Sequence, residues 1–185
     1  MHASTKWVVR LLAVTAATVA GIGVSGYPMP LSREAHLLLH ILGAILLSGN
    51  IIVTAAWVLM AERTRDATVL RFAVRAANWA DAFFTVPGVF LLVANGDILA
   101  RQWGGVFQTG WLALSLAVFA VGGIIWMGLL IRYQQRLIVL SEPSWGEGLS
   151  PEFFTTLHQW YLGGTAATLL PLISLGLMVW KPELW

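Results

Sequence analysis

The amino-acid sequence predicts an all-α protein, a polytopic bundle of transmembrane helices with four core helices and a fifth at the N-terminus. Of its 185 residues, 58% are hydrophobic and only 11% are charged, and the mean hydropathy is +0.76. A soluble domain carries about 25% charged residues, so this chain lacks the polar surface that water requires. Its apolar stretches have the length of membrane helices and lack the alternating polarity of barrel strands. We therefore expect a multi-pass protein whose first partner is the lipid bilayer.

Five apolar stretches, bounded by charged residues or proline, define the expected helices: residues 11–26, 36–61, 79–95, 109–131 and 153–180. The first has two interpretations. Lys6 and Arg10 followed by a short apolar run would suit a signal peptide, but no clean small-x-small cleavage site precedes the turn at residues 27–30, which favours a retained helix. The expected organisation is an N-terminal helix with a short outer loop at residues 1–35 and a four-helix transmembrane bundle at residues 36–185.

Two segments leave alternatives open. Ala13, Ala17 and Gly21 recur every four residues, a spacing that lets helix backbones approach closely, either within the bundle or in a homodimer. Residues 63–78 combine arginines with Leu70 and Phe72. This composition predicts either a helix lying in the membrane interface or a helical continuation of a neighbouring span.

The basic residues predict the orientation. Eight of the eleven lysines and arginines lie in the N-terminal tail and in residues 62–78 and 132–152, three segments that share one side if all five stretches span the membrane. The opposite side holds only Arg33, Arg101 and Lys181. The positive-inside rule therefore places the N-terminus in the cytoplasm and the C-terminus outside.

Composition also excludes several classes of function. The chain has no cysteine, which rules out disulfides, thiolate zinc sites, iron–sulfur clusters and covalently attached c-type haem. Its formal net charge of +2 is too small and too scattered for a nucleic-acid partner.

Polar side chains recur at steps of three and four in three of the predicted helices, so each set lies on one helix face. Because a polar group that faces lipid is costly, three such faces predict one shared interior. The sets are His36, His40, Asn50 and Thr54; Asn78, Asp81, Thr85 and Asn95; and His158, Tyr161, Thr165 and Thr168.

The depth of each residue, at a rise of about 1.5 Å per residue, divides these side chains into two clusters. The outer cluster is His36, His40, Asn95 and Asp97; the inner cluster is His158, Asp81, Thr85 and Thr54, with Asn50 between the two clusters. An intramembrane carboxyl at Asp81 needs a partner, and Arg75, Arg132 and His158 are the expected ones. Such a group either fixes the packing of the helices or serves as a proton relay.

His40 is the candidate ligand of a b-type haem iron or of copper. His36 and His40 lie four residues apart, the spacing of a helical metal site. One helix face cannot supply both sides of a haem, and His158 lies roughly 20 Å deeper, so a haem on His40 would be five-coordinate. His36 is then an alternative ligand, Asn95 a polar neighbour, and Asp81 with His158 a proton or propionate partner. The alternative is structural: His36 marks the interface and His40 bonds to a neighbouring helix.

Three motifs extend these expectations: LHILGA at residues 39–44 with Gly49 beyond it, RFAVRAANWADAFFTVPG at residues 71–88, and LMVWKP at residues 177–182. With them the chain resembles, over residues 36–182, an uncharacterised bacterial family of integral membrane proteins catalogued as domain of unknown function 2269. The resemblance implies a four-helix unit in the bacterial inner membrane.

A more distant resemblance comes from the histidine in the first helix of a four-helix unit and from the Pro–Gly pair at residues 87–88. These features are similar to the oxygen-independent protoporphyrinogen oxidases, which implies b-type haem binding, and to the copper-resistance D-type membrane proteins, which implies copper handling. In both cases His40 is the implied ligand. This is an analogy of fold rather than of chemistry.

Three functions follow as hypotheses. The first is a b-type haem-binding or redox membrane component that uses His40. The second is a non-catalytic accessory subunit of a larger membrane complex, whose polar faces only specify packing. The third is a small transporter of metal ions or protons that uses Asp81.

Overall fold

The computed structural model describes residues 31–142 and 148–185, and over these residues every regular element is a helix. Four helical segments are long and apolar enough to cross a membrane: Arg33–Thr64, Ala67–Trp103, Gly110–Leu140 and Pro151–Trp180. The predicted all-α transmembrane bundle is confirmed, with its four core helices. The expected helix at residues 11–26 lies outside the described residues.

Helix α2 (Arg33–Thr64) is closed at both ends by local hydrogen bonds. The Ser32 hydroxyl accepts a hydrogen bond from the amide of Ala35, which satisfies one of the free N–H groups of the first turn. At the other end Arg65 adopts the left-handed conformation, with φ of 56°, and its amide donates to the Glu62 carbonyl. The tight turn that follows leads directly into the next helix.

The second span is one long helix with an irregular turn in its middle. It comprises α3 (Ala67–Ala80), the π-helical turn η1 (Asp81–Thr85) and α4 (Val86–Ala100). The Asp66 carboxylate accepts hydrogen bonds from the amides of Thr68 and Val69 and caps α3. Of the two interpretations of residues 63–78, the helical continuation of a neighbouring span is therefore confirmed, and α3 is packed in the bundle.

The third span has the same construction, with α5 (Gly110–Ile125), the π-helical turn η4 (Trp126–Leu130) and α6 (Ile131–Leu140). Two short 3₁₀ turns, η2 (Arg101–Trp103) and η3 (Val106–Gln108), connect it to α4. Between them Gly104 and Gly105 have φ values of 83° and 108°, which other residues rarely adopt. The last span, α7 (Pro151–Trp180), begins at a Ser150 cap and contains Pro171.

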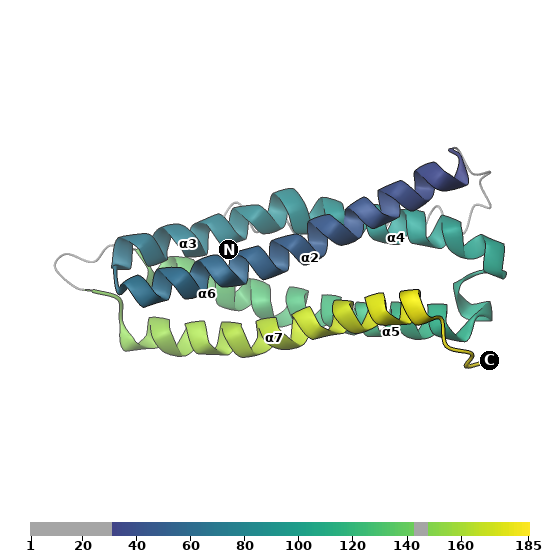
Figure 1. Ribbon diagram of the computed structural model, residues 1–185. Helices are drawn as coiled ribbons and strands as arrows, with labels where there is room; N and C mark the ends of the chain where they lie inside the picture. The colour runs from purple at the N-terminus through teal and green to yellow at the C-terminus, as the bar shows by residue number, and fades with distance from the viewer. Residues whose placement is uncertain (1–30, 143–147) are drawn as a thin grey trace.

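The helices form two layers (Figure 1). In one layer α2 packs along α3 and α4, and in the other α7 packs along α5 and α6. The layers are joined by contacts of α2 with α7 and of α3 with α6 around a core that includes Val58, Leu70, Leu137, Phe153 and Leu157. We call this the basic end, because it carries Arg63, Arg65, Arg71, Arg75, Arg132 and Arg136.

Within the first layer the backbones of α2 and α4 touch at two glycines. A Cβ atom added to Gly43 would lie 2.6 Å from the Leu92 nitrogen, and one added to Gly88 would lie 2.9 Å from the Leu47 nitrogen. Only glycine fits at such distances, and small residues at the contact are a common way for membrane helices to associate closely. The glycine pair therefore fixes how α4 lies on α2.

Candidate functional site

The carboxyl group of Asp81, in η1, is the centre of a buried polar cluster between the two layers. Its Oδ1 accepts hydrogen bonds from Asn50 Nδ2 at 2.9 Å and from Thr85 Oγ1 at 3.0 Å. Its Oδ2 accepts a hydrogen bond from Gln134 Nε2 of α6 at 3.0 Å. The Trp126 indole of η4 lies beside the same carboxyl group. We call Asn50, Asp81, Thr85 and Gln134 the Asp81 cluster.

No cationic side chain of the described residues pairs with Asp81. The ion pairs found in this part of the chain join Arg75 to Glu142 at 2.6 Å and Arg136 to Glu152, all four of them exposed. The expectation that Arg75, Arg132 or His158 would pair with Asp81 is therefore wrong. The physical reason is that Arg75 reaches its partner at the surface, whereas Asp81 lies deeper and receives uncharged donors instead.

His158 also does not join the inner cluster. Its side chain is exposed on α7, and its Nδ1 is 3.3 Å from the carbonyl oxygen of Phe154 in the same helix. The interior of α7 at this level is occupied by the fully buried Phe153 and Leu157. Asn50, which we expected between the two clusters, instead lies at the depth of Asp81. It is therefore Asn50, and not His158, that belongs to the inner cluster.

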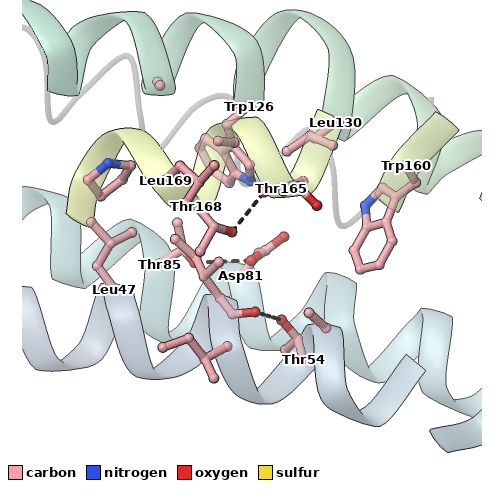
Figure 2. A pocket seen from close by; sticks show the side chains of 18 of the residues that line it. Leu47, Thr54, Asp81, Thr85, Trp126, Leu130, Trp160, Thr165, Thr168 and Leu169 are labelled. Carbon is pink, nitrogen blue, oxygen red and sulfur yellow. Dashed lines mark hydrogen bonds between the residues drawn. The ribbon is translucent and has the colours of Figure 1, made fainter. Parts of the chain in front are cut away.

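The Asp81 cluster borders a cavity of about 460 Å³ between the layers, which we call the interlayer cavity. Figure 2 shows Asp81, Thr54 and Thr85 on one side of it and Thr165 and Thr168 of α7 on the other. The predicted shared interior of the three polar faces is thus confirmed for these residues. Four aromatic side chains also line the cavity: Phe119, Trp126, Trp160 and Tyr161.

Both π-helical turns face this cavity. Asp81 and Thr85 come from η1, and Trp126 and Leu130 come from η4. A π turn inserts one extra residue into a helix, is rare, and is frequently found at functional sites. Sequence reasoning missed both turns and Gln134, whose residue types carry no specific signal for these roles.

A polar link connects the cavity to the basic end. Tyr161 lines the cavity, and its hydroxyl donates a hydrogen bond of 2.9 Å to Glu62 Oε2 near the end of α2. Glu62 is partly exposed. The link therefore places a carboxylate of the basic end one hydrogen bond from a residue of the cavity wall.

The outer cluster is partly as predicted. His36 is only 2% exposed, and its Nδ1 is 2.7 Å from Asn95 Oδ1. Because an amide oxygen can only accept, Nδ1 carries the proton and Nε2 is an acceptor. That Nε2 is buried and has no hydrogen-bond partner. His36 is therefore a buried residue that bonds to α4.

His40 bonds to the neighbouring helix, as its structural interpretation predicts. Its Nδ1 is 2.7 Å from the Leu92 carbonyl oxygen, so Nδ1 is protonated and Nε2 is an acceptor. Gly96 makes room for the ring, since an added Cβ there would lie 3.0 Å from His40 Cε1. Among residues 31–142 and 148–185, no group of three or more histidine, aspartate or glutamate side chains could hold a metal ion.

None of the described histidines lines the interlayer cavity. A haem with His40 as its iron ligand would therefore lie outside this cavity. The imidazole of His40 itself suits the role of an iron ligand. The hydrogen bond from its Nδ1 to the Leu92 carbonyl fixes the ring and leaves Nε2 free to coordinate.

The four long apolar helices, with large hydrophobic side chains exposed along them, define the chain as a polytopic integral membrane protein. A family model described as a predicted integral membrane protein (DUF2269) matches residues 35–182, and the chain belongs to this family. The resemblance seen in the sequence motifs is thereby confirmed. No curated protein and no solved structure matches the chain.

Proposed function

We propose that the protein is a small transporter in which Asp81 takes up and releases a proton inside the membrane. One observation carries the proposal: a carboxyl group borders a cavity within the membrane-spanning part and has no cationic partner among the described residues. Ionisable groups inside a membrane are costly, and those that are kept commonly mark ion pathways.

The neighbours of Asp81 suit a group that changes its charge. Asn50, Thr85 and Gln134 donate to its two oxygens and are themselves neutral. They solvate the carboxylate without a permanent counter-ion. A proton that arrives through the cavity therefore competes with no lysine or arginine of the described chain, and its release leaves a hydrogen-bonded anion.

The fold supplies a polar route on one side of this group. Towards the basic end, Tyr161 and Glu62 provide polar atoms beyond the cavity. The two π turns and Pro171 are interruptions of regular helix beside the cavity, and such points allow helices to bend. These features support proton movement between the cavity and the basic end.

The test is proton flux into liposomes that contain the purified chain and a pH-sensitive dye, driven by a potassium diffusion potential. We expect flux with the natural chain, flux at the level of protein-free liposomes with Asp81→Asn, and unchanged flux with Asp97→Asn. The control makes the same chemical change on α4 outside the cavity. Equal flux for Asp81→Asn and the natural chain, or no flux with any variant, contradicts the proposal.

A second candidate function is binding of b-type haem or copper through His40. The observation in its favour is the 2.7 Å contact from Nδ1 to the Leu92 carbonyl, which leaves Nε2 available, with the buried His36 Nε2 as an alternative ligand. Bound haem would supply one-electron transfer.

The haem proposal is tested by one optical spectrum of the purified protein before and after dithionite. We expect a Soret band that His40→Ala removes and His158→Ala retains, because His158 lies on the exposed face of α7. A colourless protein contradicts haem binding. If both flux and colour are absent, the accessory-subunit hypothesis is favoured, and partners that copurify in mild detergent become its test.

A further inference from the structure

We propose that the interlayer cavity binds a hydrophobic organic cation, such as an alkyl- or aryl-substituted ammonium or phosphonium ion, with Asp81 as its counter-ion. The inference rests on the proposed function, since both use the Asp81 carboxyl group. It adds the class of molecule that exchanges with the proton.

Size is the first argument. The cavity volume of about 460 Å³ falls within the range of roughly 300–1,000 Å³ that small-molecule sites occupy. A proton or a bare metal ion needs no such space. A metal ion would also need several oxygen ligands. Apart from Asp81, the carboxylates and histidines of residues 31–142 and 148–185 are absent from the cavity wall.

The composition of the wall is the second argument. Around the single carboxyl group the lining is mainly aliphatic and aromatic, with Leu47, Ile51 and Leu130 among its residues. Thr54, Thr165 and Thr168 also line it, but their hydroxyls donate to backbone carbonyls of their own helices. A ligand that fits has one charge and much apolar surface.

The aromatic residues of the wall favour a positive charge on the ligand. The aromatic residues Phe119, Trp126, Trp160 and Tyr161 line the cavity. Aromatic faces attract cations, and the attraction is strongest in desolvated sites. Trp126 lies beside Asp81, so a cation near the carboxylate would also contact an indole ring.

Access is the fourth argument. Ile52, Met127 and Leu169 line the cavity and are also exposed on the outside of the bundle, at 55%, 49% and 53% of their surface. The cavity therefore reaches the lipid-facing surface of the described chain. Hydrophobic cations partition into bilayers and could enter from there, whereas a hydrated inorganic ion could not.

Binding balances as an exchange. The protonated Asp81 carboxyl group releases its proton to water, and the organic cation takes its place beside the carboxylate, so the net charge of the site is unchanged. No covalent bond other than that O–H bond breaks. The same carboxyl group thus holds either a proton or the organic cation.

The experiment measures binding of tetraphenylphosphonium to the purified full chain in detergent by equilibrium dialysis. Tetraphenylborate, which has nearly the same shape and the opposite charge, is the matched probe. We expect saturable binding of the phosphonium ion, no saturable binding of the borate ion, and at least about tenfold weaker phosphonium binding to Asp81→Asn, as for loss of a close charge partner. Asp97→Asn should bind like the natural chain.

A steric pair of variants tests the location independently of charge. Gly164 lines the cavity, and a Cβ atom added there meets nothing within 4 Å, so the side chain of Gly164→Leu starts in open space and occupies ligand space. Gly49 is equally open and lies outside the cavity wall, so Gly49→Leu is its control. We expect Gly164→Leu to weaken phosphonium binding at least several-fold and Gly49→Leu to leave it unchanged.

Equal binding of the two probes, or phosphonium binding that neither Asp81→Asn nor Gly164→Leu weakens, overturns the inference. If proton flux still depends on Asp81 in that case, only the organic cation is wrong and the proposed function stands. If that flux is also absent, the proposed function fails with it.

Discussion

Asn50 of α2 donates one hydrogen bond to Asp81 and a second, of 2.8 Å, to Thr85, so a single amide group holds both polar ends of the π turn η1. Thr85 in turn donates to Asp81. The three side chains form a closed ring in which each donor has an acceptor. Such a ring fixes the direction of the carboxyl group more firmly than one hydrogen bond does.

Asn50→Leu should destabilise the protein. The change removes two hydrogen bonds from the buried cluster, and a typical intramolecular hydrogen bond contributes about 0.5–1.5 kcal/mol. The measurement is reversible unfolding in mixed micelles, compared with Asn50→Leu in an Asp81→Leu background. In the Asp81→Leu background, Asn50→Leu should lower the free energy of unfolding by less than it does in the natural chain. Equal costs in the two backgrounds would show that the two residues are energetically independent.

Gly43→Ala and Gly88→Ala should each destabilise the pairing of α2 and α4. The added methyl group would lie 2.6 or 2.9 Å from a backbone nitrogen of the other helix, and overpacking of this kind costs about 1–3 kcal/mol. Gly49→Ala is the control, since its Cβ meets nothing within 4 Å. Thermal unfolding in detergent should rank Gly49→Ala as the most stable of the three variants. The reverse order would mean that the helices separate without cost.

Asn95→Leu should cost more than the double change His36→Leu with Asn95→Leu. The single change leaves the buried Nδ1–H of His36 without an acceptor, a loss of about 1–3 kcal/mol, whereas the double change removes both polar groups. The measurement is the free energy of unfolding of four proteins: the natural chain, His36→Leu, Asn95→Leu and the double variant. A double variant as unstable as the sum of both single ones would indicate that His36 has another role in the fold.

Tyr161→Phe should slow proton flux several-fold while the protein stays folded. The variant keeps the ring but loses the hydroxyl that donates to Glu62, which is the polar link between the cavity and the basic end. The liposome assay with the pH-sensitive dye provides the rate, and Tyr133→Phe on α6 is the matched control. Unchanged flux in Tyr161→Phe would place the proton route elsewhere.

Lys181→Met should destabilise the end opposite the basic end by a small amount. The Lys181 ammonium lies 5.5 Å from the ring centre of Trp103 and 5.7 Å from that of Trp111. Exposed cation–π contacts are worth about 0.5–1 kcal/mol, and methionine keeps most of the side-chain length. The expected result is a lower unfolding temperature together with a change in tryptophan fluorescence. A variant as stable as the natural chain would show that these contacts contribute nothing.

Sequence periodicity predicted most of the interior because polar side chains at steps of three and four must share a helix face. Thr54, Asp81, Thr85, Thr165 and Thr168 border one cavity for this reason. The prediction failed at the start of α7. There His158 belongs to the same series in sequence, but the side that faces the other helices is taken by Phe153 and Leu157. A periodic pattern predicts which residues share a helix face. Which part of that face is buried depends on the packing of the neighbouring helices.

Other features were beyond sequence patterns for a different reason. A π turn depends on which carbonyl each amide selects, and nothing in the residues 81–85 or 126–130 specifies that selection. Gln134 lies between Arg132 and Arg136 and would normally be assigned to a solvated surface, yet it is buried and donates to Asp81. The predicted orientation, with the N-terminus in the cytoplasm, stays a prediction, as do a homodimer and additional subunits.

The close contact of α2 and α4 has a mechanical consequence. Two backbones in direct contact at Gly43 and Gly88 cannot slide past each other without a steric clash, so this contact holds α2 and α4 together. The opposite half holds η4 and Pro171 beside the cavity. We therefore expect any widening of the cavity to come from bending of α5 and α7 more than from separation of α2 and α4.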